Sequence, residues 1–112
     1  MALSEPLHNQ LTELISNNRV VLFMKGDRRT PLCGFSAQVV QILDQLLPVY
    51  ETVDVLSAPE IRSGIKLFSD WPTIPQLYVD GQFIGGASIV AEMHTSGELQ
   101  KLINANPDVK SE

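Results

Sequence analysis

The chain has 112 residues, 44% of them hydrophobic, and a formal net charge of −5, which together indicate one globular domain and argue against nonspecific nucleic-acid binding. No apolar run approaches the roughly 20 residues that span a bilayer, and residues 1–10 lack the pattern of an export or transit signal. A single cysteine excludes an internal disulfide, which fits a reducing compartment, so we expect a cytoplasmic protein. We expect one domain over residues 1–105 and a polar C-terminal tail over residues 106–112.

The first part of the chain predicts a helix followed by a buried strand. Apolar residues between 7 and 15 recur at the spacing of one helix face, and Ser4 and Pro6 mark the start of that helix. Residues 19–24 then form the next segment, in which the apolar residues 20–24 run together. Because these residues do not alternate with polar ones, we expect a strand that is buried on both of its faces.

A loop, a second helix and a short strand are expected next. The loop covers residues 25–32, and the helix runs from residue 37 to just before Pro48, with one broad apolar face. Residues 50–56 are typical of a short strand. The loop therefore separates a buried strand from an amphipathic helix.

A third helix is predicted from residue 57 to residue 69. Ser57 and Glu60 have the spacing of a capping box, and Pro59 is tolerated in the first turn. Residues 71–75 cannot continue this helix, because each of their two prolines forces the preceding residue out of the α region.

The last third of the chain predicts a hairpin and a final helix. Two short strands, residues 76–79 and 82–84, are joined by Asp80-Gly81, a strong signal for a two-residue turn. A helical region follows over residues 88–103, with a break expected near residues 95–97. Strand–helix–strand connections favour parallel neighbours, whereas the hairpin must be antiparallel. The order αβαβαββα thus predicts an α/β, thioredoxin-like arrangement, with a four-stranded mixed sheet and helices on both faces.

Cys33 lies between the buried strand and the helix that follows it, in a segment that also carries Lys25, Arg28 and Arg29. A lone cysteine is most often a small buried hydrophobe. In this setting, however, a helix N-terminus and nearby cations lower the pKa of a thiol, and Gly34 leaves room for another molecule. We therefore predict that Cys33 is a reactive or metal-ligating thiol.

Position 36 restricts what this thiol can do. A dithiol oxidoreductase needs a second cysteine there, and Ser36 cannot form a disulfide, so any redox turnover requires a thiol from outside the chain. A two-iron cluster needs about four ligands, usually thiolates, and one chain supplies one. Two chains and two small thiols would complete the set, which predicts a dimer with an exogenous thiol.

Four motifs lie in register across nearly the whole chain, residues 5–102: KG at 25–26, CGFS at 33–36, WPTIP at 71–75 and GG at 85–86. With these motifs the chain resembles the monothiol glutaredoxins of the CGFS class. The resemblance implies a thioredoxin-like fold that binds glutathione and carries a [2Fe–2S] cluster between two subunits. It also implies delivery of the cluster to apo iron–sulfur recipient proteins, a BolA-like partner protein, and weak or absent dithiol-type reductase activity.

The resemblance assigns roles to individual residues. Cys33 would be the cluster ligand and, in a redox reaction, the thiol that becomes glutathionylated. Lys25 would meet the glycine carboxylate of glutathione, unless it is an ordinary solvated loop lysine. Arg62 and Lys66, four residues apart on one helix face, would reach the same end of the tripeptide. The alternative for this pair is an ordinary exposed helix face.

Two further segments complete the implied glutathione site. The Ile74 backbone would bind the glutathione cysteine as a strand does, which requires a cis Pro75; otherwise Pro75 only begins a strand. The backbone around Ala87 and Ser88 would bind the γ-glutamyl carboxylate. The family usually has aspartate where this chain has Ser88, which could still cap the helix but lacks the charge for the γ-glutamyl ammonium. We therefore expect glutathione binding weakened by about tenfold and a less stable cluster.

Other candidate residues carry less chemistry. His8 and His94 are far apart in sequence, and we interpret both as surface or capping residues rather than metal ligands. We expect Trp71 to pack beside the segment that carries Cys33, residues 25–36, which we call the active loop. Within it, we expect residues 27–29 to be solvated and able to face a partner.

Three functions remain open from the sequence. The first is a homodimeric [2Fe–2S] carrier that uses Cys33 and glutathione. The second is a glutathione-dependent thiol–disulfide oxidoreductase, in which Cys33 alone removes glutathione from substrates. The third is a glutathione-binding adaptor that neither carries iron nor catalyses. No nucleic-acid or membrane partner is expected.

Overall fold

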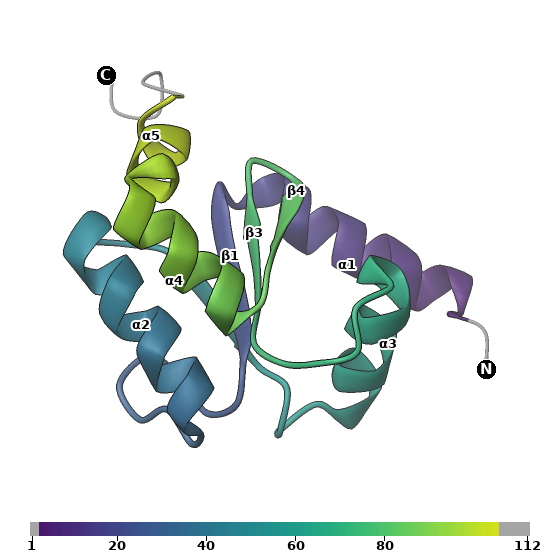
Figure 1. Cartoon of the computed structure of the whole chain (residues 1–112). Coiled ribbons are helices and arrows are strands. Elements are labelled where there is room, and N and C mark those ends of the chain that lie inside the picture. The colour runs from purple at the N-terminus through teal and green to yellow at the C-terminus, as the bar shows by residue number, and fades with distance from the viewer. Residues whose placement is uncertain (1–2, 106–112) are drawn as a thin grey trace.

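The computed structural model describes residues 3–105, so the tail predicted over residues 106–112 lies outside the described part. The chain folds into five helices and four strands within those residues (Figure 1). In chain order they are α1 (Glu5–Asn17), β1 (Val20–Met24), α2 (Gly34–Leu46), β2 (Glu51–Asp54), α3 (Pro59–Ser69), β3 (Gln76–Val79), β4 (Gln82–Gly85), α4 (Ala87–Ser96) and α5 (Glu98–Asn104). Among them, no helix is long and apolar enough to cross a membrane.

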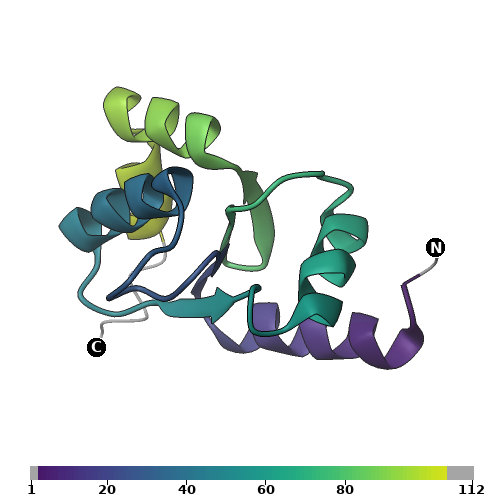
Figure 2. The ribbon, with the colours of Figure 1, turned by 90° about the horizontal axis from the view of Figure 1, so that it is seen from below.

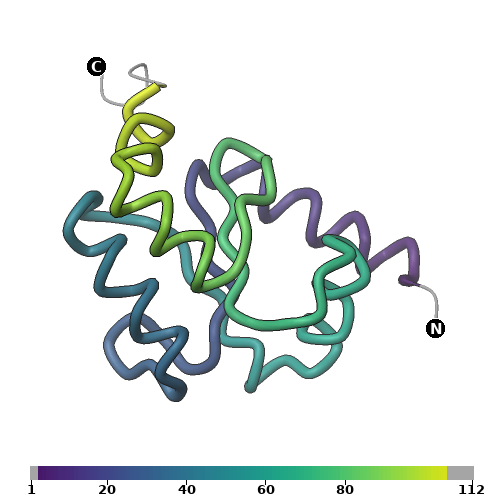
Figure 3. The backbone as a smooth tube through the Cα atoms, viewed as in Figure 1, coloured from purple at the N-terminus to yellow at the C-terminus, as the bar shows by residue number. Residues whose placement is uncertain are grey.

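The strands form one mixed sheet in the order β2-β1-β3-β4. As predicted, β1 and β2 are parallel across the α2 connection, and β3 and β4 form an antiparallel hairpin. The prediction that α3 also links parallel neighbours is wrong, because β3 pairs with β1 in the antiparallel direction. After α3 the chain re-enters the sheet at the end of the strands where β2 finished, but on the other side of β1 (Figure 3). The last residue of β2, Asp54, lies opposite Met24, and the first residue of β3, Gln76, lies opposite Phe23.

Helices cover both faces of the sheet, with α2, α4 and α5 on one side and α1 and α3 on the other (Figure 1). Strand β1 has all five residues buried, as predicted. Its side chains alternate between the two halves of the core: Val20, Leu22 and Met24 pack with α2, α4 and α5, whereas Val21 and Phe23 pack with α1 and α3. The continuous apolar run therefore reflects a strand at the centre of both halves of the core.

The predicted N-terminal cap is confirmed for α1 but not for α3. Ser4 caps α1 by accepting a hydrogen bond from the Leu7 N–H at 3.3 Å. The capping box predicted at Ser57 is wrong: α3 begins at Pro59 after Ala58, without a side-chain cap. The Ser57 hydroxyl instead donates to the Asp54 carbonyl at 3.0 Å, because that residue organises the preceding turn.

The C-terminal half follows its turn signals closely. Asp80 and Gly81 both have positive φ angles, 51° and 82°, as a tight hairpin requires. The predicted break in the last helix is confirmed at Gly97, which separates α4 from α5 and adds one helix to the expected order.

Candidate functional site

Cys33 is the N-cap of α2, so this helix begins three residues earlier than predicted. The Cys33 Sγ accepts a hydrogen bond from the Ser36 N–H at 3.3 Å, and the side chain is half-buried. A Cβ atom added at Gly34 would have no other atom within 4 Å. The sulfur therefore sits at the positive end of a helix, next to open space through which a second molecule can approach.

Ser36 is fully buried and hydrogen-bonded on two sides. Its Oγ accepts from the Lys25 N–H at 3.1 Å and lies 3.3 Å from the Cys33 Sγ. When the sulfur is a thiolate it has no proton, so in that state the hydroxyl must donate to it. The residue that rules out a disulfide thus also stabilises the thiolate.

The pKa of the Cys33 thiol lies below its ordinary value, as the sequence predicted. Partial burial raises this pKa, but hydrogen bonds from the Ser36 hydroxyl and from the N–H groups of Ser36 and Phe35 lower it, as does the positive charge of Lys25. The lowering contributions outweigh burial. Cys33 is consequently more fully ionised near neutral pH than a free cysteine.

We expect Ser36→Ala to raise the pKa of the Cys33 thiol, because the hydroxyl no longer stabilises the thiolate. The thiolate fraction at pH 7 then falls, and alkylation by iodoacetamide slows. Losing the bond from the Lys25 N–H should also destabilise the fold by about 1 kcal/mol. A pH series of alkylation rates, together with urea unfolding, measures both effects. An unshifted titration curve would contradict this role.

Arg28 does not belong to the cations around the thiol. Its Nε pairs with Asp44 at 2.8 Å, its Nη1 donates to the Pro48 carbonyl at 3.1 Å, and its guanidinium lies 4.2 Å from the Tyr50 ring centre. The prediction of a solvated loop is confirmed for Asp27 and Arg29, which are exposed, whereas the Arg28 side chain is partly buried in these contacts. These contacts fasten the active loop to the far end of α2.

A cleft of about 600 Å³ opens beside the thiol, lined by the residue just after β1 and by residues of α2, α3, the segment before β3 and the start of α4, whose backbones Figure 2 shows from below. Every residue that the sequence assigned to glutathione lines it, although they come from four separate segments. These are Lys25, Arg62, Lys66, Ile74, Ala87 and Ser88. Cys33 does not line the cleft, but its neighbour Phe35 does, with 66% of its surface exposed. Sequence reasoning missed Phe35 and the similarly exposed Leu32, although an apolar residue beside a reactive thiol was visible in the CGFS motif.

Residues 71–75 form one wall of the cleft. The Ile74–Pro75 peptide bond is cis, which confirms the sequence prediction. Trp71 lines the same cleft as Lys25, and its ring centre lies 5.5 Å from that of Phe83. A Cβ atom at Gly86 would come within 3.3 Å of the Trp71 Nε1, so glycine allows the loop and the start of α4 to pack closely.

Ser88 lines the cleft but does not cap α4. The helix begins one residue earlier, at Ala87, with Gly86 as its N-cap and no side-chain hydrogen bond. The prediction that Ser88 serves as an N-cap is therefore wrong, and its side chain is exposed at the second position of the helix. The N–H groups of the first turn still point out of the helix, as an anion would require.

The histidines stay outside this site. His8 packs on Phe68 with ring centres 5.2 Å apart, and His94 lies in the last turn of α4. Within residues 3–105, no three His, Cys, Asp or Glu side chains are grouped so that they could hold a metal ion. Within that part of the chain, Cys33 has no such group of ligands around it.

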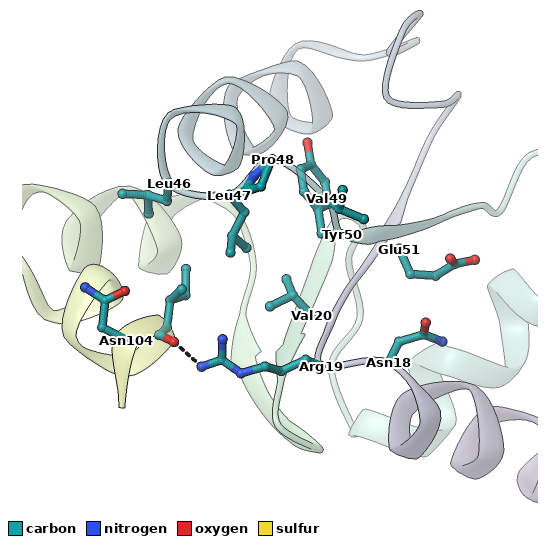
Figure 4. Close-up of a pocket in the computed structure, with 11 residues that line it drawn as sticks. Asn18, Arg19, Val20, Leu46, Leu47, Pro48, Val49, Tyr50, Glu51 and Asn104 are labelled. Carbon is teal, nitrogen blue, oxygen red and sulfur yellow. Dashed lines mark hydrogen bonds between the residues drawn. The ribbon is translucent and has the colours of Figure 1, made fainter. Parts of the chain in front are cut away.

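A second cleft, of about 570 Å³, lies between the ends of α2 and α5 (Figure 4). Its lining is mainly apolar, and the Arg19 guanidinium crosses one side to donate to the Ile103 carbonyl. The same side chain pairs with Asp80 at 3.0 Å. Neither Cys33 nor any residue predicted to bind glutathione lines this cleft, so we do not assign the thiol chemistry or glutathione binding to it.

The chain is similar to several known proteins. A sequence model of the glutaredoxin family matches residues 20–84. An uncharacterized monothiol glutaredoxin of Synechocystis sp. is 51% identical over 94 residues, which cover 84% of this chain and 88% of the relative. Monothiol glutaredoxin-5, mitochondrial, of Schizosaccharomyces pombe is 48% identical, covering 90% of this chain and 71% of the relative. The solution structure of reduced poplar apo GrxS14 has a TM-score of 0.80 at 47% identity, covering 94% of this chain and 96% of that one.

Proposed function

The chain belongs to the monothiol glutaredoxins of the glutaredoxin family, and on that basis we propose that it is a glutathione-dependent carrier of a [2Fe–2S] cluster. The observation that carries the proposal is the position of the single cysteine. Cys33 lies beside a cleft lined by cations and by an exposed helix N-terminus, with open space at Gly34.

The cleft suits a tripeptide with a carboxylate at each end. Lys25, Arg62 and Lys66 supply positive charge for the glycine carboxylate, while the free N–H groups around Ala87 and Ser88 suit the γ-glutamyl carboxylate. Ile74 lines the same cleft, and its backbone would pair with the middle residue. Bound in this way, glutathione would place its own thiol beside Cys33.

The cluster would be the cargo of this protein rather than a resident cofactor. Four thiolates fit a [2Fe–2S] cluster, and the described part of one chain contributes Cys33 without a neighbouring ligand group. A homodimer with two glutathiones would supply all four. We propose a BolA-like protein and apo iron–sulfur proteins as partners, in the cytoplasm. Named relatives include mitochondrial and chloroplastic proteins, so a fractionation experiment would decide the compartment.

The lowered pKa of the Cys33 thiol favours one alternative function, the removal of glutathione from protein thiols. The Cys33 thiolate would attack the glutathione sulfur of a mixed disulfide, which releases the substrate thiolate and leaves Cys33 glutathionylated. A second glutathione thiolate would then attack that disulfide, restore Cys33 and leave as oxidised glutathione. Ser36 cannot take the place of this external thiol.

Anaerobic reconstitution of the full chain with iron, sulfide and glutathione tests the proposal. We expect a coloured dimer that transfers its cluster to an apo-ferredoxin, measured by visible absorbance and size-exclusion chromatography. A colourless monomer that rapidly reduces glutathionylated substrates would support the oxidoreductase instead. A colourless protein that binds glutathione without turnover would support the adaptor.

We expect Ser88→Asp to strengthen glutathione binding by about tenfold, because a carboxylate at the cleft can pair with the γ-glutamyl ammonium. The same carboxylate lies in the first turn of α4, where negative charge stabilises a helix by about 0.3–1 kcal/mol. Calorimetric titration and the lifetime of the cluster in air measure the effect. Unchanged affinity and lifetime would show that Ser88 is not a weak point of the site.

A further inference from the structure

Gln76 is a polar side chain inside the core. It is the first residue of β3, opposite Phe23 of β1, and none of its surface is exposed. Apart from Ser36, it is the only fully buried polar residue in the part of the chain that the structure describes. A buried amide is unfavourable unless its hydrogen bonds are made, so its partners indicate why it is there.

Both partners of the Gln76 amide nitrogen belong to the wall of the cleft. The Nε2 donates to the Trp71 carbonyl at 3.1 Å and to the Thr73 carbonyl at 3.2 Å. Carbonyl oxygens only accept, so the orientation of this amide is determined by its surroundings. The Oε1 atom, in contrast, is buried without a partner among residues 3–105.

Stability of the core does not account for this arrangement. Methionine would fill nearly the same volume and would bring no unpaired Oε1 into the core, although the Trp71 and Thr73 carbonyls would lose their donor. The wall, however, needs donors, because Pro72 and Pro75 have no N–H with which to organise residues 71–75. Gln76 supplies two donors from a rigid strand and holds the wall against the sheet.

We propose that Gln76 is a positioning residue for glutathione: its two hydrogen bonds fix residues 71–75 so that the Ile74 backbone is ready to pair with the tripeptide. The inference rests on the proposed glutathione site and adds a residue that does not line the cleft. Without these bonds, the wall samples other conformations, and glutathione must order it on binding.

Gln76→Met tests this in the full-length chain. We expect the dissociation constant for glutathione, measured by calorimetry, to rise about tenfold, as the loss of two ordinary hydrogen bonds allows. The midpoint of thermal unfolding should fall only slightly, because removal of the unpaired Oε1 offsets part of the loss of the two hydrogen bonds. The rate of Cys33 alkylation should also stay the same, because Ser36 and Lys25 keep their bonds. Gln82→Met, the same change at the exposed first residue of β4, is the matched control and should bind as the unaltered chain does.

A measurement on the unaltered chain does not depend on how the variant folds. The side-chain amide protons of Gln76 should be protected from solvent exchange and should shift in NMR spectra on glutathione addition, whereas those of Gln82 should exchange freely. Rapid exchange at Gln76 would overturn the inference. So would equal glutathione affinity in Gln76→Met, or an equal loss in Gln82→Met. If the unaltered chain does not bind glutathione, the proposed function itself fails.

Discussion

Cys33→Ser should remove the visible absorbance of the reconstituted protein completely and abolish its thiol chemistry, while the fold remains intact. A serine oxygen does not ionise near neutral pH and is a poor ligand for an iron–sulfur cluster. Serine is also a good N-cap, so it can still accept the hydrogen bond from the Ser36 N–H that begins α2. Absorbance, size-exclusion chromatography and thermal unfolding, measured side by side, separate the loss of ligand from the loss of structure.

Two outcomes would contradict this expectation. A coloured Cys33→Ser dimer would mean that other groups hold the cluster, so the hypothesis that each chain contributes Cys33 as its one thiolate ligand would be wrong. A Cys33→Ser chain that unfolds would mean that the sulfur is mainly structural. Cys33→Ala is the matched comparison, because it removes the ligand and the cap together. We expect it to be as colourless as Cys33→Ser but less stable, by about 0.5–2 kcal/mol.

Gly26→Ala should be the most damaging substitution in the active loop. Gly26 has a φ of +86°, and an added Cβ would lie 2.4 Å from the Thr30 carbonyl oxygen and 2.7 Å from the Leu32 nitrogen. Both are backbone atoms, held by the Gly26–Pro31 bridge and by the bond from the Leu32 N–H to the Lys25 carbonyl. The unfavourable φ and the clash together predict destabilisation by about 2–5 kcal/mol. We expect glutathione binding and cluster binding to weaken as well, because the altered backbone at residue 26 would displace the neighbouring Lys25.

Gly81→Ala is the matched control for Gly26→Ala. Gly81 has nearly the same φ, +82°, but an added Cβ would meet no other atom within 4 Å. We therefore expect a loss of only about 1–2 kcal/mol, from the backbone conformation alone, with glutathione binding unchanged. Urea unfolding of both variants measures the difference. Equal destabilisation would show that crowding in the active loop contributes nothing.

Local signals predicted most of the secondary structure correctly. The buried strand β1, the hairpin at Asp80-Gly81 and the break at Gly97 each depend on a few neighbouring residues. The signals failed where a side chain bonded to a partner other than the one that its local pattern suggested. The Ser57 hydroxyl bonds to the turn that Asp54 organises, and Arg28 pairs with Asp44, sixteen residues further on.

The direction of β3 could not be predicted from neighbouring residues, because it depends on where the chain re-enters the sheet. Crossover rules describe a helix that carries the chain back along the sheet. Here α3 and residues 70–75 return the chain to the end of the strands where β2 finished, so β3 runs beside β1 in the antiparallel direction. This return also places residues 71–75 and Lys25 around the same cleft.

The sequence by itself determined the chemistry of the thiol. Cys33 and Ser36 are three residues apart, so the start of one helix brings them together. The glutathione candidates, in contrast, span residues 25–88 and were reached only through the family motifs. Only the tertiary structure gathered them into one cleft, and only it showed that the Gln76 side chain is buried and turned back onto the carbonyls of the loop just before its strand. Hydrogen bonds of this kind leave no periodic pattern in a sequence, whereas a capped helix start does.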